Sequence, residues 1–400
     1  MPLASEDEIL PAVRQELEAA KFIDIHTHLF MPSLGSLGLW GIDSLLTYHY
    51  LEAEFFRCST VQPGEYRQLS TCQKADLIWR TLFVENTPVS EAARGVIAVL
   101  HAFGLATNAT DLMEAREFFR AQDARAHIDR VFALAGISEV VMTNDPLDPE
   151  EGPLWERGVE RDPRFHAALR LDRILVECPD RWNIAELRRF LATWHDRLRP
   201  AYMAVSLPDT FEFPDDSPRG LLLAEAVLPA CRDFEIPLSL MIGVRRQVNP
   251  ALQLAGDASG AADLRALERL CVAFPDNRFL ITILSRENQH ELCIYARKFS
   301  NLMPFGCWWF LNNPSIVEEV TTERLEMLGT SFIPQHSDAR VLEQLIYKWR
   351  NTRRTLAPVL ANKYRLLCED GRQVTRAAIR RDIHRLFRSN FERLLPGGVI

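Results

Sequence analysis

Eight short apolar runs, separated mostly by segments with helical periodicity, place the tightest limit on the fold of this 400-residue chain. Several of the runs are apolar on both faces, as are parallel strands that are buried on both sides. Strands that alternate with helices give a parallel sheet, and eight such units predict a closed (β/α)8 barrel of the α/β class. The predicted strands are Phe22–Leu29, Val140–Asn144, Phe165–Asp172, Tyr202–Leu207, Pro237–Val244, Arg278–Ser285, Leu302–Phe310 and Phe332–Asp338.

The structural alternative is an open, doubly wound sheet. Against it, no G-x-G-x-x-G motif follows the first run and no G-x-x-x-x-G-K-[ST] motif occurs in the chain. One spacing is unusual, because about 110 residues separate the first run from the second, far more than an ordinary βα loop. We therefore expect a single domain over residues 1–400, with a helical insertion at 40–136 over the top of the barrel. Its predicted helices are Ser44–Phe56, Lys74–Phe83, Glu91–Phe103, Asp111–Phe119 and Ala126–Ala135.

Composition narrows the partners and the compartment. A formal net charge of −8 argues against nucleic acid and acidic membranes as partners. Two basic stretches lie near residues 348–354 and 372–388, and we interpret the second as an amphipathic helix with a solvated basic face. The eight cysteines are scattered without a C-x-x-C pair, which favours a reducing compartment. The acidic N-terminus does not resemble a signal peptide, and no apolar run has transmembrane length, so we expect a cytoplasmic protein.

Asp24, His26 and His28 stand at alternate positions of the first run. Because a strand has a period of two, both imidazoles are expected on one face, near the strand end where barrel enzymes place their active sites. Two adjacent imidazoles can bind a divalent cation, and burying them without partners is costly. An H-x-H motif alone is a weak signal among ten histidines, and a hydrogen-bonded structural pair is the alternative. We expect Asp24 to have a structural or supporting role.

The segment Gln335-His-Ser-Asp-Ala-Arg340 ends the eighth run. In a closed barrel the eighth strand lies beside the first, so Asp338 is expected near the same cation as a ligand, a general base or both. Arg340 is then expected to hold an oxyanion or a substrate carboxylate. The alternative is that Asp338 caps a helix and Arg340 is a surface charge.

The H-x-H motif on the first strand and the aspartate on the eighth together resemble the amidohydrolase superfamily, whose barrel is of the metal-dependent hydrolase type. Within it, the chain resembles the uronate isomerase (glucuronate isomerase) family, and it looks like the shorter, divergent bacterial branch. The resemblance covers essentially the whole chain, and its double-tryptophan and S-D-A-R segments are more specific than H-x-H. The segments that carry it are Leu46-Thr-Tyr-His-Tyr50, Val141-Met-Thr-Asn-Asp-Pro146, Arg170, Gly306-Cys-Trp-Trp-Phe310 and His336-Ser-Asp-Ala-Arg340.

The resemblance implies which residues bind metal, which act in catalysis and which bind substrate. It places the metal on His26, His28 and Asp338, and makes Asp338 the proton-transfer base. The other residues with an implied catalytic role are Tyr50, Arg340 and His49, where either Tyr50 or His49 relays the proton. The residues with an implied substrate-binding role are Arg170, Trp308, Trp309 and Arg246. The structural alternatives are helix packing for Tyr50, a barrel ion pair for Arg170 and core packing for Trp308.

The chain departs from the family at the fifth strand. Where many amidohydrolases and the longer uronate isomerases carry a histidine, this chain reads Leu240-Met-Ile-Gly243. The Met241 thioether is a poor ligand for a hard or borderline cation. The sixth run offers no histidine, and His290 lies further along. We therefore expect one divalent ion, zinc first, with manganese, iron and cobalt as alternatives.

The resemblance implies the interconversion of D-glucuronate with D-fructuronate, and of D-galacturonate with D-tagaturonate, by proton transfer between C2 and C1 through an enediol. The rival is a metal-dependent hydrolase, a lactonase or amidase acting on a sugar-acid derivative, because H-x-H plus aspartate also suits water activation. A barrel that binds a sugar acid without turnover is a third class. The expected partner is a small hexuronate, with no nucleic acid and no membrane. Homo-oligomerisation and the preferred epimer stay open.

Overall fold

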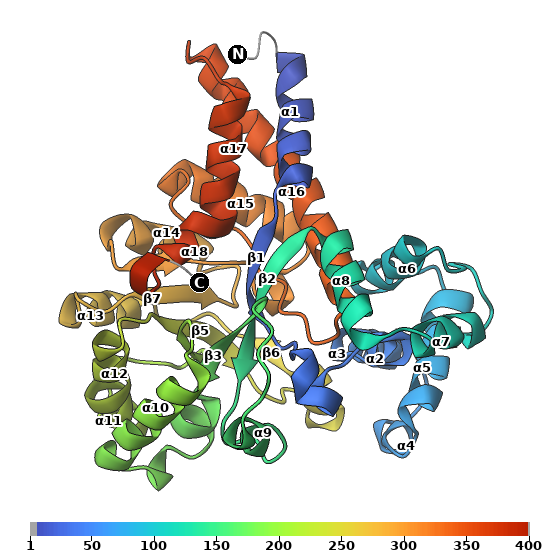
Figure 1. Cartoon of the computed structure of the whole chain (residues 1–400), viewed down its shortest axis with the longest axis horizontal. Coiled ribbons are helices and arrows are strands. Elements are labelled where there is room, and N and C mark those ends of the chain that lie inside the picture. Colours follow the sequence, from blue (N-terminus) through green and yellow to red (C-terminus); the bar gives the residue numbers. More distant parts are fainter. Residues whose placement is uncertain (1–5, 399–400) are drawn as a thin grey trace.

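A computed structural model describes residues 6–398, and it shows a parallel β-sheet wrapped by helices (Figure 1). The main strands follow one another in the order β1-β2-β3-β4-β5-β7-β8, and all of these neighbours pair in parallel. A two-residue strand, β6 (Ala258–Ser259), pairs antiparallel with β5. The bounds of the main strands are Phe22–Thr27 (β1), Ile137–Asn144 (β2), Phe165–Arg170 (β3), Met203–Pro208 (β4), Leu238–Arg245 (β5), Phe279–Ile283 (β7) and Leu302–Pro304 (β8).

Residues 332–339 fill the gap between β8 and β1 without forming a regular strand. Ile333 N–H donates to the last carbonyl of β8 (3.0 Å), and Asp338 N–H donates to His26 O of β1 (3.1 Å). The barrel is therefore closed, and the predicted (β/α)8 fold is confirmed. The eighth predicted strand is irregular because Pro334 has no N–H to donate and Asp338 has a φ of +54°.

The seventh predicted strand is also shorter than expected. Only Leu302–Pro304 is regular, and the rest of the predicted range, to Phe310, is a turn followed by a short 3₁₀ helix, η7 (Trp309–Leu311). Gly306 has a φ of +63° and Trp309 a φ of +46°, and both values turn the chain out of the extended conformation. This turn brings the double tryptophan over the end of the barrel.

Helices outside the barrel cover the strands, as Figure 1 shows. α1 (Glu6–Ala19) and α17 (Arg376–His384) pack beside the long helix α16 (Gln344–Glu369) at the N-terminal side of β1. The other helices of the barrel wall are α8 (Ala124–Ala135), α9 (Glu151–Arg157), α10 (Ile184–Leu198), α11 (Pro218–Leu222), α12 (Leu228–Asp233), α13 (Arg265–Ala273), α14 (Gln289–Lys298), α15 (Pro314–Leu328) and α18 (Asn390–Glu392).

The long connection between β1 and β2 is helical, and α4 to α7 group on one side of the barrel (Figure 1). Its helices before α8 are α2 (Ile42–Leu46), α3 (His49–Cys58), α4 (Pro63–Arg67), α5 (Thr71–Trp79), α6 (Glu91–Phe103) and α7 (Met113–Arg120). The helix predicted at 44–56 is broken at Tyr48, which is extended (φ −71°, ψ 140°). The treatment of 40–136 as an insertion within one domain stays a prediction, and residues 1–5 and 399–400 of that domain lie outside the described part.

Two groups of buried apolar side chains surround the strands. The larger lies between the sheet and the helices, where Phe22 of β1 stacks on Phe387 with 3.9 Å between ring centroids. The smaller fills the barrel interior and includes Ile23 and Ile25 from β1. Phe391 near the C-terminus joins this interior group, so the end of the chain closes the barrel on the side away from the strand ends that carry the site.

Candidate active site

A β-bulge in β1 directs both histidines into one cavity. Asp24 pairs with Val140 and Thr27 pairs with Met142, so three steps along β1 match two steps along β2. The extra residue breaks the strict alternation that the sequence predicts. His26 and His28 line the cavity, as expected, whereas the Asp24 carboxylate accepts a hydrogen bond from the indole of Trp349 on the outer helix α16 (2.8 Å). Asp24 therefore does not share the face of the two imidazoles.

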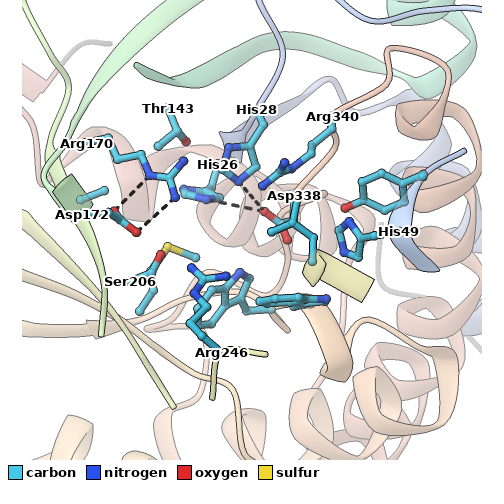
Figure 2. A pocket seen from close by; sticks show the side chains of 16 residues that line it. His26, His28, His49, Thr143, Arg170, Asp172, Ser206, Arg246, Asp338 and Arg340 are labelled. Carbon is cyan, nitrogen blue, oxygen red and sulfur yellow. Dashed lines mark hydrogen bonds and ion pairs between the residues drawn. The ribbon is translucent and has the colours of Figure 1, made fainter. Parts of the chain in front are cut away.

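Asp338 meets the two histidines from the other side of the barrel closure (Figure 2). Its Oδ1 atom lies 3.7 Å from Nε2 of His26 and 3.3 Å from Nε2 of His28. The potential ligand atoms of these three residues all lie within 4.8 Å of one another. Two nitrogens and one carboxylate oxygen are a donor set that suits zinc and related divalent ions.

Burial sets the protonation of this group. It lowers the pKa of His26 to about 3 and that of His28 to about 4, so both rings are neutral near pH 7. Burial opposes ionisation of Asp338, but the contact with His28 and the charge of Lys348 outweigh it and hold the pKa of that carboxyl below its usual range. Neutral imidazoles beside an ionised carboxylate are the protonation states that a metal ligand set needs.

Tyr202 fixes the orientation of His26. The Tyr202 hydroxyl donates to Ile25 O (2.7 Å), so its oxygen accepts from Nδ1–H of His26 (3.1 Å). This arrangement leaves Nε2 of His26 as the free acceptor facing Asp338. Sequence reasoning missed Tyr202, although its alternation with Ala204 and Ser206 in the fourth run places all three on the inner face.

Three arginines expected at the site do line the cavity (Figure 2). The Arg340 guanidinium has no hydrogen bond or ion pair to any residue in the described part of the chain. Arg170, in contrast, is held by Asp172, with its Nε 3.1 Å from Oδ2 and its Nη2 3.1 Å from Oδ1. Arg246 donates to Asp257 (2.6 Å), and only half of its side chain is buried.

The aromatic residues divide into those that reach the cavity and those that support it. Trp308, Trp309 and His49 line it, as predicted. Tyr50 does not line it, and its hydroxyl is buried with no hydrogen-bond partner among residues 6–398. Tyr48, which was not predicted, takes the lining position, because the extended backbone that separates α2 from α3 turns its ring toward the cavity.

The cavity lining from β5 contains a methionine and no histidine. Met241 is buried and lines the cavity where the related proteins were expected to carry histidine. His290 is exposed and forms an ion pair with Glu323, away from the cavity lining. The remaining polar lining comes from Thr143, Asp172 and Ser206, none of which was predicted from the sequence.

Besides Oδ1 of Asp338, two polar atoms of lining residues are buried without a hydrogen-bond partner in the described chain, Nε2 of His49 and Nε1 of Trp309. Buried donors and acceptors are nearly always paired, so an unpaired one needs an explanation. A polar ligand in the cavity supplies one. With the free guanidinium of Arg340, these atoms make the cavity suited to an oxygen-rich anion.

No protein-family model and no curated protein sequence matches the chain. Among solved structures, a uronate isomerase from Bacillus halodurans C-125 superimposes with a TM-score of 0.96 and 48% sequence identity, over 98% of this chain and 97% of that one. The chain belongs to the uronate isomerase family. This enzyme is therefore an isomerase, and the resemblance expected from the sequence is confirmed.

Two more distant structures have the same fold. A uronate isomerase from Thermotoga maritima matches with a TM-score of 0.74 and 15% identity, over 99% of this chain and 100% of that one. A glucuronate isomerase from Caulobacter crescentus matches with a TM-score of 0.74 and 14% identity, over 99% and 96%. Within residues 6–398, no helix of this family member is both long and apolar enough to cross a membrane.

Proposed function

We propose that this cavity interconverts an aldose hexuronate and its ketose, D-glucuronate with D-fructuronate and D-galacturonate with D-tagaturonate. The observation that carries the proposal is the buried, ionised Asp338 between two neutral histidines, beside the unpaired cation Arg340. A base next to a fixed positive charge suits proton abstraction from a carbon beside a carbonyl. The membership of the uronate isomerase family supports the same reaction.

One divalent ion on His26, His28 and Asp338 belongs to the proposal. The donor atoms fit such an ion, because Tyr202 leaves Nε2 of His26 free and Oδ1 of Asp338 is buried without a hydrogen-bond partner among the described residues. Zinc is the first expectation, with manganese, iron and cobalt as alternatives. When bound, the ion would polarise substrate oxygens and fix their positions.

Asp338 acts as the proton carrier. Its carboxylate takes the proton from C2 of the open-chain sugar, the C2–H electron pair forms the C1–C2 double bond, and negative charge moves to the C1 oxygen. Arg340 stabilises this enediolate by its charge. Return of the carried proton to C1, with transfer of the O2 proton to O1, gives the ketose. His49 is placed to carry the hydroxyl proton because its Nε2 is unpaired at the cavity, and Tyr50 lies behind it as a packing residue.

Substrate is held by the other lining residues. Arg170 is fixed by Asp172 in one orientation, so it offers the cavity a pre-aligned cation. Arg246 lies over Trp309, 5.9 Å from the ring centroid, at the open side of the cavity. The Trp309 indole and the Trp308 ring complete the wall. We assign Arg246 to the substrate carboxylate, which is distal to the reacting carbons. We assign Arg170 to the hydroxyl oxygens in the middle of the open-chain sugar.

The test is product analysis with purified protein that has been stripped of metal and reloaded with zinc or manganese. D-glucuronate, D-galacturonate and aldonolactones are supplied separately. The proposal predicts ketose from at least one uronate, no lactone hydrolysis, and loss of more than about a thousandfold in turnover on Asp338→Asn with the fold retained. Hydrolysis of a lactone without any ketose from either uronate overturns it in favour of the hydrolase class.

A further inference from the structure

The peptide that carries Asp338 into the cavity has a backbone conformation that must be held. Asp338 has a φ of +54°, in the left-handed region that L-residues other than glycine rarely adopt. Such a conformation costs about 1–3 kcal/mol and persists only where the surroundings fix it. In this conformation the side chain of Asp338 points at His26 and His28, so the contacts that hold the backbone also hold the site.

Two buried charged side chains form hydrogen bonds with the backbone of the preceding residue, Ser337, one with its N–H and the other with its carbonyl. Oδ1 of Asp24 accepts a hydrogen bond from Ser337 N–H (3.0 Å), and Nζ of Lys348 donates to Ser337 O (2.5 Å). The other oxygen of Asp24 is fixed by the indole N–H of Trp349, the residue after Lys348 in α16. Both contacts to Ser337 therefore trace back to neighbouring positions of one helix.

Burial of the Lys348 ammonium group costs desolvation free energy that packing alone does not explain. The residue is 6% exposed, and desolvation of an ammonium group is costly. It forms no ion pair within 4.0 Å in the described chain, and its only hydrogen-bond acceptor there is the Ser337 carbonyl. An apolar side chain in this place would avoid the desolvation cost, so a buried cation here needs a reason beyond packing.

We propose that Lys348 and Asp24 are positioning residues that clamp the Ser337–Asp338 peptide and thereby set the geometry of the metal and proton-transfer site. Neither residue lines the cavity, so each acts through the peptide rather than on the substrate. The basic stretch at 348–354 thus includes a residue with a site role. The consequence for catalysis rests on the proposed function, whereas the clamp itself can be measured without it.

The chain supplies a matched control on the same helix. Arg353, five residues after Lys348, is also 6% exposed and also donates to backbone carbonyls. Three of its acceptors are Leu17 O, Ala135 O and Gly136 O, at the ends of α1 and α8 and away from the cavity, and the fourth is the Trp349 carbonyl of its own helix (3.4 Å). Arg353→Met removes a buried cation and its carbonyl contacts from α16 without touching Ser337.

The experiment compares the wild-type chain with Lys348→Met, Asp24→Asn and Arg353→Met, all stripped of metal. Hydrogen exchange by mass spectrometry reports on peptides covering 335–340 and 133–137, and calorimetry reports the affinity for zinc and manganese. Lys348→Met is expected to speed exchange in 335–340 and weaken metal binding by about 10–100-fold. Arg353→Met is expected to speed exchange in 133–137 and to change metal affinity less than threefold.

The kinetic signature separates positioning from general destabilisation. With metal restored, Lys348→Met should lower kcat with KM changed little, since the cavity lining is intact, and Lys348→Arg should recover part of the loss. The proposal is overturned if Lys348→Met binds metal within twofold of wild type with unchanged exchange in 335–340, or if Arg353→Met weakens metal binding equally. If Lys348→Met does not fold, the near-isosteric Asp24→Asn tests the clamp by the same two readouts and under the same criteria. If Lys348→Met weakens metal binding and speeds exchange, but the wild-type protein converts neither uronate, the clamp is supported and the proposed reaction is overturned.

Discussion

The Tyr202 hydroxyl decides which nitrogen of His26 faces the cavity. Tyr202 is 1% exposed, and its hydroxyl is held between Ile25 O and Nδ1 of His26. The tautomer of His26 is therefore fixed before any ligand binds. Supporting hydrogen bonds of this kind orient metal-binding histidines and make them more basic. The residue belongs to the site even though it is not a ligand.

Tyr202→Phe should therefore weaken metal binding by about 10–100-fold while the chain stays folded. The reason is that His26 loses the partner of its Nδ1–H and the imidazole can turn. Calorimetric titration of the metal-free protein measures the effect. Tyr66→Phe is the control, because Tyr66 is similarly buried and donates to Glu52 in the connection between β1 and β2 (2.9 Å); equal losses in both variants would contradict the account.

The free guanidinium of Arg340 leads to a second prediction at this scale. Arg340→Met should lower kcat by about 10²–10³-fold, as does removal of one preorganised donor from an oxyanion site. Arg246 is paired with Asp257 and half-exposed, so Arg246→Met should act mainly on KM. Steady-state kinetics with one uronate distinguishes them, and a larger kcat loss in the Arg246 variant would reverse the assigned roles.

The sequence indicates the three candidate ligand residues but not the residues that support them. His26, His28 and Asp338 stand in short local patterns at strand ends, and the structure brings them together. Tyr202 and Lys348 are distant in sequence and act through single hydrogen bonds, so no local pattern marks them. The roles of the predicted site residues in catalysis stay predictions.

At the scale of elements, two irregularities shape the site. The bulge in β1 separates Asp24 from the histidine face, and the turn after β8 brings the tryptophans over the cavity. Neither follows from a period of two, because a single inserted residue or one left-handed residue reverses every later side chain. The strands are therefore predictable as runs, while their ends and the faces of their side chains are not.

Gly306 shows how tightly that turn is packed. A Cβ added there would lie 1.8 Å from Nδ1 of the buried His336, and the φ of +63° is itself unfavourable for alanine. Gly306→Ala should destabilise the fold by about 3 kcal/mol or more. Gly104, at the end of α6, has a φ of +76° and nothing within 4 Å of an added Cβ, so Gly104→Ala should cost only about 1–2 kcal/mol. Chemical denaturation measures both, and equal costs would contradict the packing argument.

At the scale of the whole molecule, a half-buried group of polar and charged side chains joins the C-terminal segment to the barrel. Glu139 of β2 contacts His166 of β3 (2.9 Å) and Arg388 near the C-terminus (2.9 Å). The hydrogen bond from His166 and the charge of Arg388 lower the pKa of Glu139 to about 2. The cluster links two strands to the segment whose Phe391 fills the barrel end.

The sign of the pH effect follows from the lowered pKa. The folded-state pKa of Glu139 lies below the ordinary 4.5, so its stabilisation is complete above about pH 4.5 and is lost as the pH falls toward 2. Glu139→Gln should reduce the unfolding free energy by about 2 kcal/mol at pH 7, and the difference should shrink between pH 4.5 and 3. Glu160→Gln, in an exposed pair with Arg125, should cost less than about 0.5 kcal/mol at either pH. A Glu139 difference that grows on acidification would contradict the assignment.

The closed barrel itself was predictable, because eight apolar runs with helical segments between them admit few other packings. The way it closes was not, since residues 332–339 replace a strand by a few hydrogen bonds around a proline and a left-handed aspartate. That irregular closure is also what places Asp338 beside β1. The proton carrier of the proposed reaction thus lies in an irregular part of the barrel.

The central claim is proton transfer between C2 and C1 at this cavity, and NMR of the metal-loaded enzyme with D-glucuronate in D₂O tests it most directly. Asp338 is buried but lines the cavity, so we expect the proton that it carries to exchange with solvent during turnover. The account predicts ketose with deuterium at C1, formed by the wild-type chain and not by Asp338→Asn. No ketose from the wild-type chain, or ketose formed equally well by Asp338→Asn, would contradict it.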